Sequence, residues 1–335
     1  MDERGTSRLR FLGGAAALAG LAAGAGVNAR SARSAGPRSY SAGNFFLVLD
    51  GVKTGFLSSV EGGAITGEVI RETSGGSYFI KKHLGQPKYE EFTIDLGLSM
   101  AKPVYDWIAS SWSTNYQRRN GSILAGDAKL EVQTQRDFFN ALITETTIPA
   151  ADAAAKDVAS MTVKFAPEII RKAKGGGALP AEPKNKEQKQ WLPSNFRLAI
   201  DGVDCTKVSK VDAFTVKQAT AQDGIGDGRD YQPEPGKLEF PNLRIALAES
   251  AAESWVTWHE DFVISGNNDE SKEKGGSLVF LSPDRQTDLL EVKFYNLGIF
   301  KLVPDKVESN SDQIRRVVAE LYCERMELVY KGGAA

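Results

Sequence analysis

Residues 44–52 read NFFLVLDGV, and residues 195–203 read NFRLAIDGV. Both stretches are short and mainly apolar and end near Asp-Gly, which is typical of a strand that enters a tight turn. Six of the nine residues of the first copy recur unchanged 151 positions later. A constant spacing over a long stretch predicts that the chain holds two copies of one unit. The same spacing joins Ser58 to Ser209, Val60 to Val211, Ile94 to Ile245, Leu96 to Leu247 and Trp107 to Trp258.

The rest of each copy predicts more strands and one helix. The runs EEFTIDLGL and NLRIALA alternate apolar and polar residues, as half-buried strands do. The motif FFN at 138–140 matches FYN at 294–296, now about 156 residues apart, so we expect small insertions between the copies. Apolar residues at helical spacing predict one helix in each unit, and we expect the tryptophans among them to lie in the core. These residues are Val104, Trp107, Ile108 and Trp112, then Ala251, Trp255, Trp258 and Phe262.

We therefore predict a mainly β protein with two tandem antiparallel β-barrel or β-sandwich domains, each flanked by one α-helix. The first domain is expected at 43–172 and the second at 194–331. Residues 173–193 are rich in Gly, Pro and Lys and read as a linker.

Residues 1–42 are expected to be a signal peptide or a disordered arm. The segment has a basic start and a weakly apolar run from Phe11 to Val27, and the motif SRLRFL is similar to a twin-arginine export signal. If the signal is used, the protein is exported to the periplasm or cell surface; otherwise it assembles in the cytoplasm or in a tail-like particle. No membrane span is expected once this segment is removed.

Composition narrows the class of function. The 335-residue chain has a net charge of -2, which gives no overall basic surface for nucleic acid, so sequence-specific nucleic-acid binding is not expected. Its two cysteines, Cys205 and Cys323, are expected to be unpaired apolar side chains, with a bond between the halves as the alternative. Nucleophile, phosphate-loop and dinucleotide motifs are missing from the sequence, so we predict no enzyme and no cofactor.

Candidate site residues are few. His83 and His259 have no partners at metal-ligand spacing. The acidic loop QDGIGDGRD offers Asp223, Asp227 and Asp230 as weak calcium ligands, although a solvated hairpin tip is the commoner explanation for such a cluster. Long Gly-containing loops stand at the same place in both copies and are expected to contact other subunits. The residues predicted for these oligomer-interface loops are Ser74, Gly75, Gly76, Lys81, Lys82, Gly224, Gly226 and Gly228.

The order of these motifs resembles the tail tube proteins of contractile phages and the inner tubes of phage-derived contractile injection systems. The resemblance rests on NFFLVLDGVKTGFLSSVEGGA, GQPKYEEFTIDLGL, VYDWI and FFNALITETTIP in the first copy, and it is looser in the second. It implies a small β-barrel with a flanking helix, six of which close into a ring, with rings stacking into a hollow tube.

Since one chain holds two such units, the resemblance implies a homotrimer that forms a pseudo-hexameric ring, with a hexamer as the other possibility. The expected partners are copies of the chain itself and other tail-tube, sheath or baseplate-like proteins. The expected role is a ring, hub, adaptor or stacked tube. The alternative function is a secreted tandem β-domain binding module for carbohydrate or protein.

Overall fold

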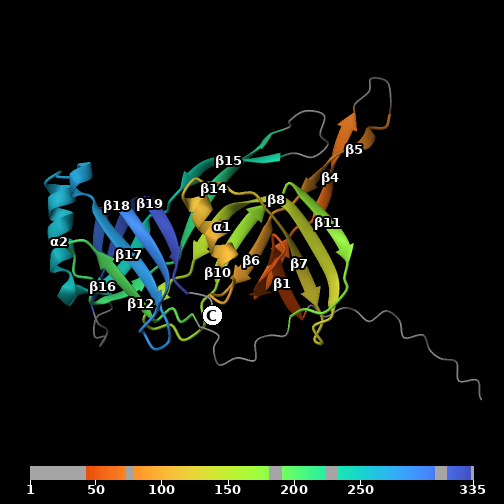
Figure 1. Cartoon of the computed structure of the whole chain (residues 1–335). Helices are drawn as coiled ribbons and strands as arrows, with labels where there is room; N and C mark the ends of the chain where they lie inside the picture. The colour runs from red at the N-terminus through yellow and green to blue at the C-terminus, as the bar shows by residue number, and fades with distance from the viewer. Residues whose placement is uncertain (1–42, 73–77, 181–190, 224–231, 306–314, 333–335) are drawn as a thin grey trace, which may run out of the picture. The chain divides into compact units, whose positions relative to one another are not determined.

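The computed structural model describes residues 43–72, 78–180, 191–223, 232–305 and 315–332 (Figure 1). Most of these residues lie in antiparallel strands, so the mainly β class expected from the sequence is confirmed. In these ranges, no helix has the length and apolar character needed to cross a bilayer.

The first half contains eleven strands and helix α1 in the described residues. In chain order they are β1 (Asn44–Leu49), β2 (Val52–Leu57), β3 (Ser59–Gly62), β4 (Ile65–Glu72), β5 (Lys81–Tyr89), β6 (Phe92–Leu96), α1 (Lys102–Trp112), β7 (Arg119–Gly126), β8 (Val132–Ile148), β9 (Ala151–Asp152), β10 (Met161–Ala166) and β11 (Ile169–Lys174).

The second half contains eight strands and helix α2, which continues into a π-helical turn at Glu260–Ile264. In chain order they are β12 (Phe196–Ile200), β13 (Val208–Val211), β14 (Phe214–Asp223), β15 (Gln232–Glu239), β16 (Leu243–Ala248), α2 (Glu253–His259), β17 (Lys274–Leu281), β18 (Asp288–Pro304) and β19 (Arg316–Tyr330). Single 3-10 turns lie at Glu249–Ala251 and Glu270–Lys272.

The two repeated Asp-Gly turns differ in geometry. Asp50 and Gly51 both have positive φ, at 48° and 80°, as the tight turn between β1 and β2 requires. In the second copy Gly202 alone of the pair has positive φ, and Ile200 meets Val203 through an isolated bridge. The same dipeptide therefore starts a full hairpin only in the first half.

The tryptophans expected in the core are buried. Trp107 and Trp112 lie on the buried face of α1, where Pro103 occupies the first turn. Trp255 and Trp258 are buried on α2, and Phe262 extends that apolar face into the π-helical turn. Each helix thus buries large aromatic side chains, and α1 packs mainly against β19 of the second half.

The two halves share one strand order. In the first, the order is β1-β7-β8-β10-β6-β3, and in the second it is β12-β17-β18-β19-β16-β13. The long strands β8 and β18 both have 17 residues. Each carries an asparagine of positive φ at the matching place: Asn140 at 50° and Asn296 at 56°. This agreement supports the predicted duplication.

One hydrophobic core runs through both halves, and it includes Phe165 of the first and Phe280 of the second. The rings of Tyr105 and Tyr330 stack across the halves with centroids 3.8 Å apart. Since the two halves belong to one compact unit, Tyr40–Ala335, the domain limits 43–172, 173–193 and 194–331 stay predictions.

Candidate subunit-association surface

The two halves are joined by a continuous antiparallel strand pairing. Residues Phe214–Lys217 of β14 lie opposite Ile148–Glu145 of β8, and Lys210 and Val211 of β13 lie opposite Asp152 and Ala151 of β9. The register is the same in both stretches, so one ladder crosses the proline turn between β8 and β9. The ladder gives each half a partner for an edge strand that would otherwise present unpaired backbone groups.

Side chains in this ladder are well buried. Val216 of β14 is 2% exposed, and Ile148 of β8 is fully buried. The ring of Phe214 packs edge-on against Phe294, with 6.2 Å between centroids. The hydroxyls of Thr147 and Thr215 hydrogen-bond across the ladder at 2.8 Å. The contact between the halves therefore has the packing of a domain interior.

The β14–β15 hairpin also contacts the first half beyond the ladder. Arg118 Nη2 donates to Glu234 Oε1 at 2.9 Å. Phe240, which follows β15, packs edge-on against Trp112 of α1 at 6.4 Å between centroids. One hairpin of the second half thus contributes strand pairing, an ion pair and an aromatic contact to the first half.

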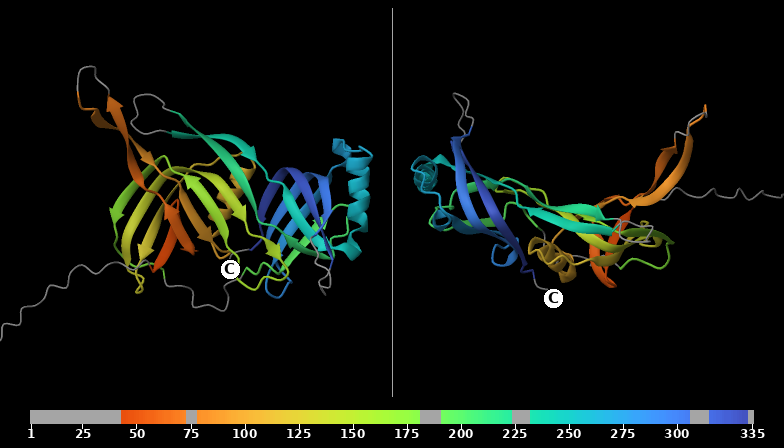
Figure 2. Two further views of the ribbon diagram at one scale, coloured as in Figure 1. Left: turned by 180° about the vertical axis from the view of Figure 1, so that it is seen from behind. Right: turned by 90° about the horizontal axis from the view of Figure 1, so that it is seen from above.

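The corresponding hairpin of the first half, β4–β5, has a different setting. It forms a two-stranded sheet of its own, and it leaves the sheet that holds β3 and β6 (Figures 1 and 2). All eight residues of β4 are exposed. Strands β4 and β5 expose several large apolar side chains. They are Ile65, Val69, Ile70 and Leu84.

Two glycines separate this hairpin from the main sheet. Gly62 and Gly63 have φ values of 80° and 69°, which favour glycine. A Cβ atom on Gly63 would lie 2.1 Å from Cε1 of Phe92, so a side chain does not fit there. The matching residues Ala213 and Phe214 have no positive φ. The strand direction therefore changes between β3 and β4 but not between β13 and β14.

The two hairpins nevertheless have the same internal register. Thr66 lies opposite Lys88, and Lys217, 151 positions later, lies opposite Glu239. Both ladders shift by one residue just after this point, between Gly67 and Val69 in one and between Gln218 and Thr220 in the other. Residues can therefore be matched between the hairpins one by one.

The predicted interface residues are only partly placed. Lys81 and Lys82 are exposed at the start of β5, on the hairpin that carries these exposed apolar side chains. The others, Ser74, Gly75, Gly76, Gly224, Gly226 and Gly228, lie outside the described residues.

Of the three predicted calcium ligands, Asp223 lies in the described ranges. Asp223 ends β14, while Asp227 and Asp230 lie outside the described ranges. Within those ranges no group of three His, Cys, Asp or Glu side chains is arranged to hold a metal ion. His83 Nδ1 lies 3.8 Å from Glu72 Oε1 on the exposed hairpin, and His259 ends α2.

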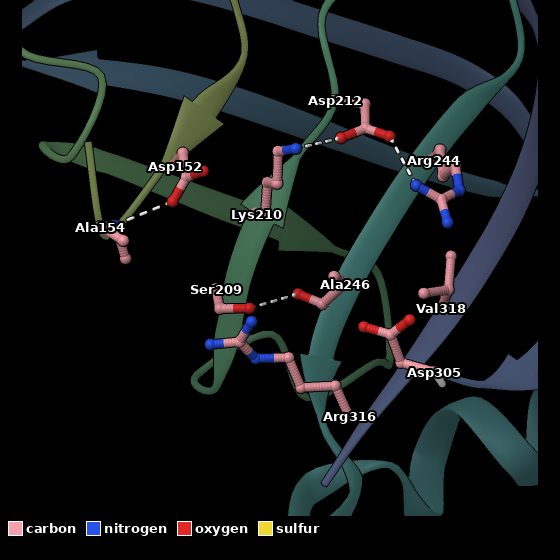
Figure 3. Close-up of a pocket in the computed structure, with 11 residues that line it drawn as sticks. Asp152, Ala154, Ser209, Lys210, Asp212, Arg244, Ala246, Asp305, Arg316 and Val318 are labelled. Atoms are coloured by element: carbon pink, nitrogen blue, oxygen red, sulfur yellow. Dashed lines mark hydrogen bonds and ion pairs between the residues drawn. The ribbon is translucent and has the colours of Figure 1, made fainter. Parts of the chain in front are cut away.

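A pocket of about 500 Å³ lies beside the β9–β13 part of the ladder (Figure 3). Its charged side chains pair with one another, since Lys210 and Arg244 each lie 2.9 Å from a different oxygen of Asp212. Burial by itself would raise the pKa of Asp212, but the hydrogen bonds from these two cations outweigh it and lower the pKa. This network lies within the second half, where it ties the end of β13 to β16.

The two cysteines are free, as expected, and burial raises the pKa of each thiol to about 11. We predict that at pH 8 the folded protein reacts with Ellman's reagent roughly a hundredfold more slowly than the unfolded chain, because the thiolate is the reactive form. The raised pKa also makes the free energy of unfolding depend on pH. Thiol ionisation leaves it unchanged below about pH 8.5 and lowers it progressively as the pH rises toward 11. The variants Cys205→Ala and Cys323→Ala each leave one thiol and so assign each labelling rate to its cysteine. Fast labelling of both thiols in the folded protein would contradict the prediction.

The two halves of this mainly β chain join edge to edge through paired strands. Residues 41–171 match the family described as T4-like virus tail tube protein gp19. The resemblance seen in the sequence is therefore confirmed for the first half. No curated protein matches the chain.

Several solved structures are similar in fold. The sheath–tube complex of an extracellular contractile injection system (PVC) has a chain that is 21% identical, with a TM-score of 0.37, over 41% of this chain and 93% of that one. A chain of the sheath/tube terminator of the same system is 22% identical, with a TM-score of 0.33, over 38% of this chain and 92% of that one. Hcp1 from Flavobacterium johnsoniae is 19% identical, with a TM-score of 0.25, over 42% of this chain and 96% of that one. Since these TM-scores are low, the family match is the stronger finding.

Proposed function

We propose that the chain is a structural protein of a phage-tail-like tube or contractile injection system, in which it assembles into a ring, hub, adaptor or stacked tube. The ladder between β8–β9 and β13–β14 carries the proposal, because it is a module-to-module contact built from sheet edges. The family match of residues 41–171 supports the same role. The exposed hairpin β4–β5 supplies a surface through which further copies can join.

The proposed ring contains three chains. A tail tube ring has six units, and each chain supplies two units with the same strand order. A repeated head-to-tail contact closes a ring when its rotation divides the circle evenly. Three chains with two modules each would give such a ring pseudo-sixfold symmetry.

The proposed partners follow from this position. The end faces of a pseudo-hexameric ring are suited to tail-tube or baseplate-like proteins, and its outer face to a sheath-like protein. The role is non-enzymatic. Export through the N-terminal segment would place the assembly in the periplasm or at the cell surface, whereas a retained segment would leave it in the cytoplasm or in a tail-like particle.

The experiment is a measurement of particle mass in solution over a wide range of concentration, with negative-stain electron microscopy of the same samples. We expect particles of three chain masses that appear as rings with a central opening. A chain that stays monomeric at all concentrations and binds a glycan or a protein ligand would overturn the proposal in favour of the binding module.

A further inference from the structure

In the contact between the halves, the end of β8 accepts β14 as its edge partner. The end of β18 is a second copy of this acceptor edge. Strands β8 and β18 shift register by one residue at the same place, just before Glu145 in one and just before Lys301 in the other. At that place each strand forms an ion pair with its neighbour. Glu145 lies 2.8 Å from Lys164, and Lys301 lies 2.7 Å from Glu320, with the charges exchanged. Residues 145–148 therefore match residues 301–304.

Strands β8 and β18 differ in what pairs with their other edge. The end of β8 lies between β10 and β14, whereas along residues 299–304 the strand that pairs with β18 in the described part of the chain is β19. The difference is visible in burial. Thr144 is 5% exposed, but the matching Phe300 is 40% exposed. Val303 is also exposed. The end of β18 thus presents apolar side chains and an edge of the kind that β14 covers on β8.

The donor strand also has a second copy. β4 matches β14 at a spacing of 151, so Ile65 stands where Val216 stands. Val216 is 2% exposed because it lies in the ladder with β8, while Ile65 is 43% exposed. Among the described residues, β4 pairs only with β5. One chain therefore carries both sides of a contact that it makes only once internally.

We infer that β4 of one chain pairs with the end of β18 of a second copy, in the register that β14 and β8 use within the chain. The inference rests on the proposed function and identifies the contact that joins the chains of the assembly. The shared register places Thr66 opposite Lys301, Ile65 opposite Leu302 and Ala64 opposite Val303. Of the side chains in these pairs, Ile65 and Val303 are apolar and exposed in the single chain, and the pairing would cover both.

The second copy is favoured over a contact within one chain. A chain that made both contacts internally would close on itself as a ring of two modules. In the structure the hairpin of the second half already occupies the edge of β8, and β4 is apart from β18 in the strand pairing. The unused donor and the unused acceptor lie in different halves, so each chain can join two neighbours head to tail.

A polar contact of the internal interface has an equivalent as well. Arg118 precedes β7 and meets Glu234 of the hairpin. Glu273 precedes β17 and matches Arg118. His83 matches Glu234, because it lies opposite Ile70 in the same register in which Glu234 lies opposite Ala221. A His83 ring N–H facing the Glu273 carboxylate of the next chain would again be a donor–carboxylate pair, with the two sides exchanged.

Cysteine cross-linking tests the register. In a chain with Cys205→Ala and Cys323→Ala, we introduce Thr66→Cys together with Lys301→Cys and oxidise with copper phenanthroline. Directly opposite residues have Cα atoms about 4.5–5.5 Å apart, within the range of a disulfide. We expect more than half of the chains to run as covalent dimers and trimers on non-reducing gels. Mixing the two single-cysteine chains should give dimers of unlike chains only.

Two control pairs use the same background. Glu145→Cys with Lys217→Cys are the matching positions inside the chain and should give a disulfide-bonded monomer. Glu72→Cys with Lys301→Cys moves the donor six residues along β4, about 20 Å, and should give no multimer.

The outcomes separate the two proposals. Rings in solution with cross-links only in the Glu72 variant, or in neither variant, overturn the register and leave the proposed function standing. A chain that is monomeric before oxidation and gives no multimer afterwards overturns both.

Discussion

Replacing Val216 with aspartate is expected to lower the free energy of unfolding by about 3–5 kcal/mol. Val216 is 2% exposed in the ladder between β14 and β8, where it lies opposite the buried Thr146. The carboxylate would lose its water and find no cation, and the buried valine surface would be lost as well. Urea unfolding followed by circular dichroism, at a concentration where the chain is monomeric, measures the change.

Val216→Ala is the companion variant, because it removes packing without adding charge. We expect it to cost about 1–2.5 kcal/mol. A loss below 1 kcal/mol for Val216→Asp would mean that the pairing between the halves is not part of the folded monomer.

Replacing Ile65 with aspartate is expected to have the opposite pattern. The residue matches Val216 in the repeat but is 43% exposed, so the free energy of unfolding should stay within about 0.5 kcal/mol of the parent chain. In the assembly the same side chain is expected to be buried against Leu302 of the next copy. Chain association should therefore weaken by about a hundredfold or more. Sedimentation velocity over a concentration series measures it.

Val263→Asp is a matched control, since Val263 is also 43% exposed but lies in the turn after α2. We expect it to leave both stability and association unchanged. If Ile65→Asp assembled like the parent chain, or if both variants weakened association equally, β4 would not be the joining strand.

Much of the fold can be predicted from the sequence because the signals are local. Alternating residues such as those of β6 indicate strands, and the spacing of Val104, Trp107 and Ile108 indicates α1. The constant offset between copies goes further, since it matches residues across the two halves. It identifies Ile65 with Val216 before any coordinates are known.

The ladder between the halves could not be predicted from the same signals. Alternation shows that a strand has a buried face, but not which strand lies at its edge. Ile65 and Val216 are both apolar residues in alternating stretches, although one is exposed and the other buried. The change of direction at Gly62 and Gly63 is visible in the sequence only as a pair of glycines, which also suit an ordinary turn.

The association role of the predicted loop residues stays a prediction. Gly-containing loops marked the two hairpins as association elements, and Lys81 and Lys82 do lie on the exposed one. The apolar side chains of β4 were missed, because exposure of an apolar strand residue depends on tertiary pairing. The proposed calcium ligands Asp223, Asp227 and Asp230 stay a prediction.

The most direct test is a cryo-electron microscopy map of the assembled protein at a resolution that separates strands. We predict an annulus with six similar strand ladders, three between β14 and β8 within chains and three between β4 and β18 of neighbouring chains. A ring in which β4 has no strand partner but β5, or a particle held together by other surfaces, would contradict this account.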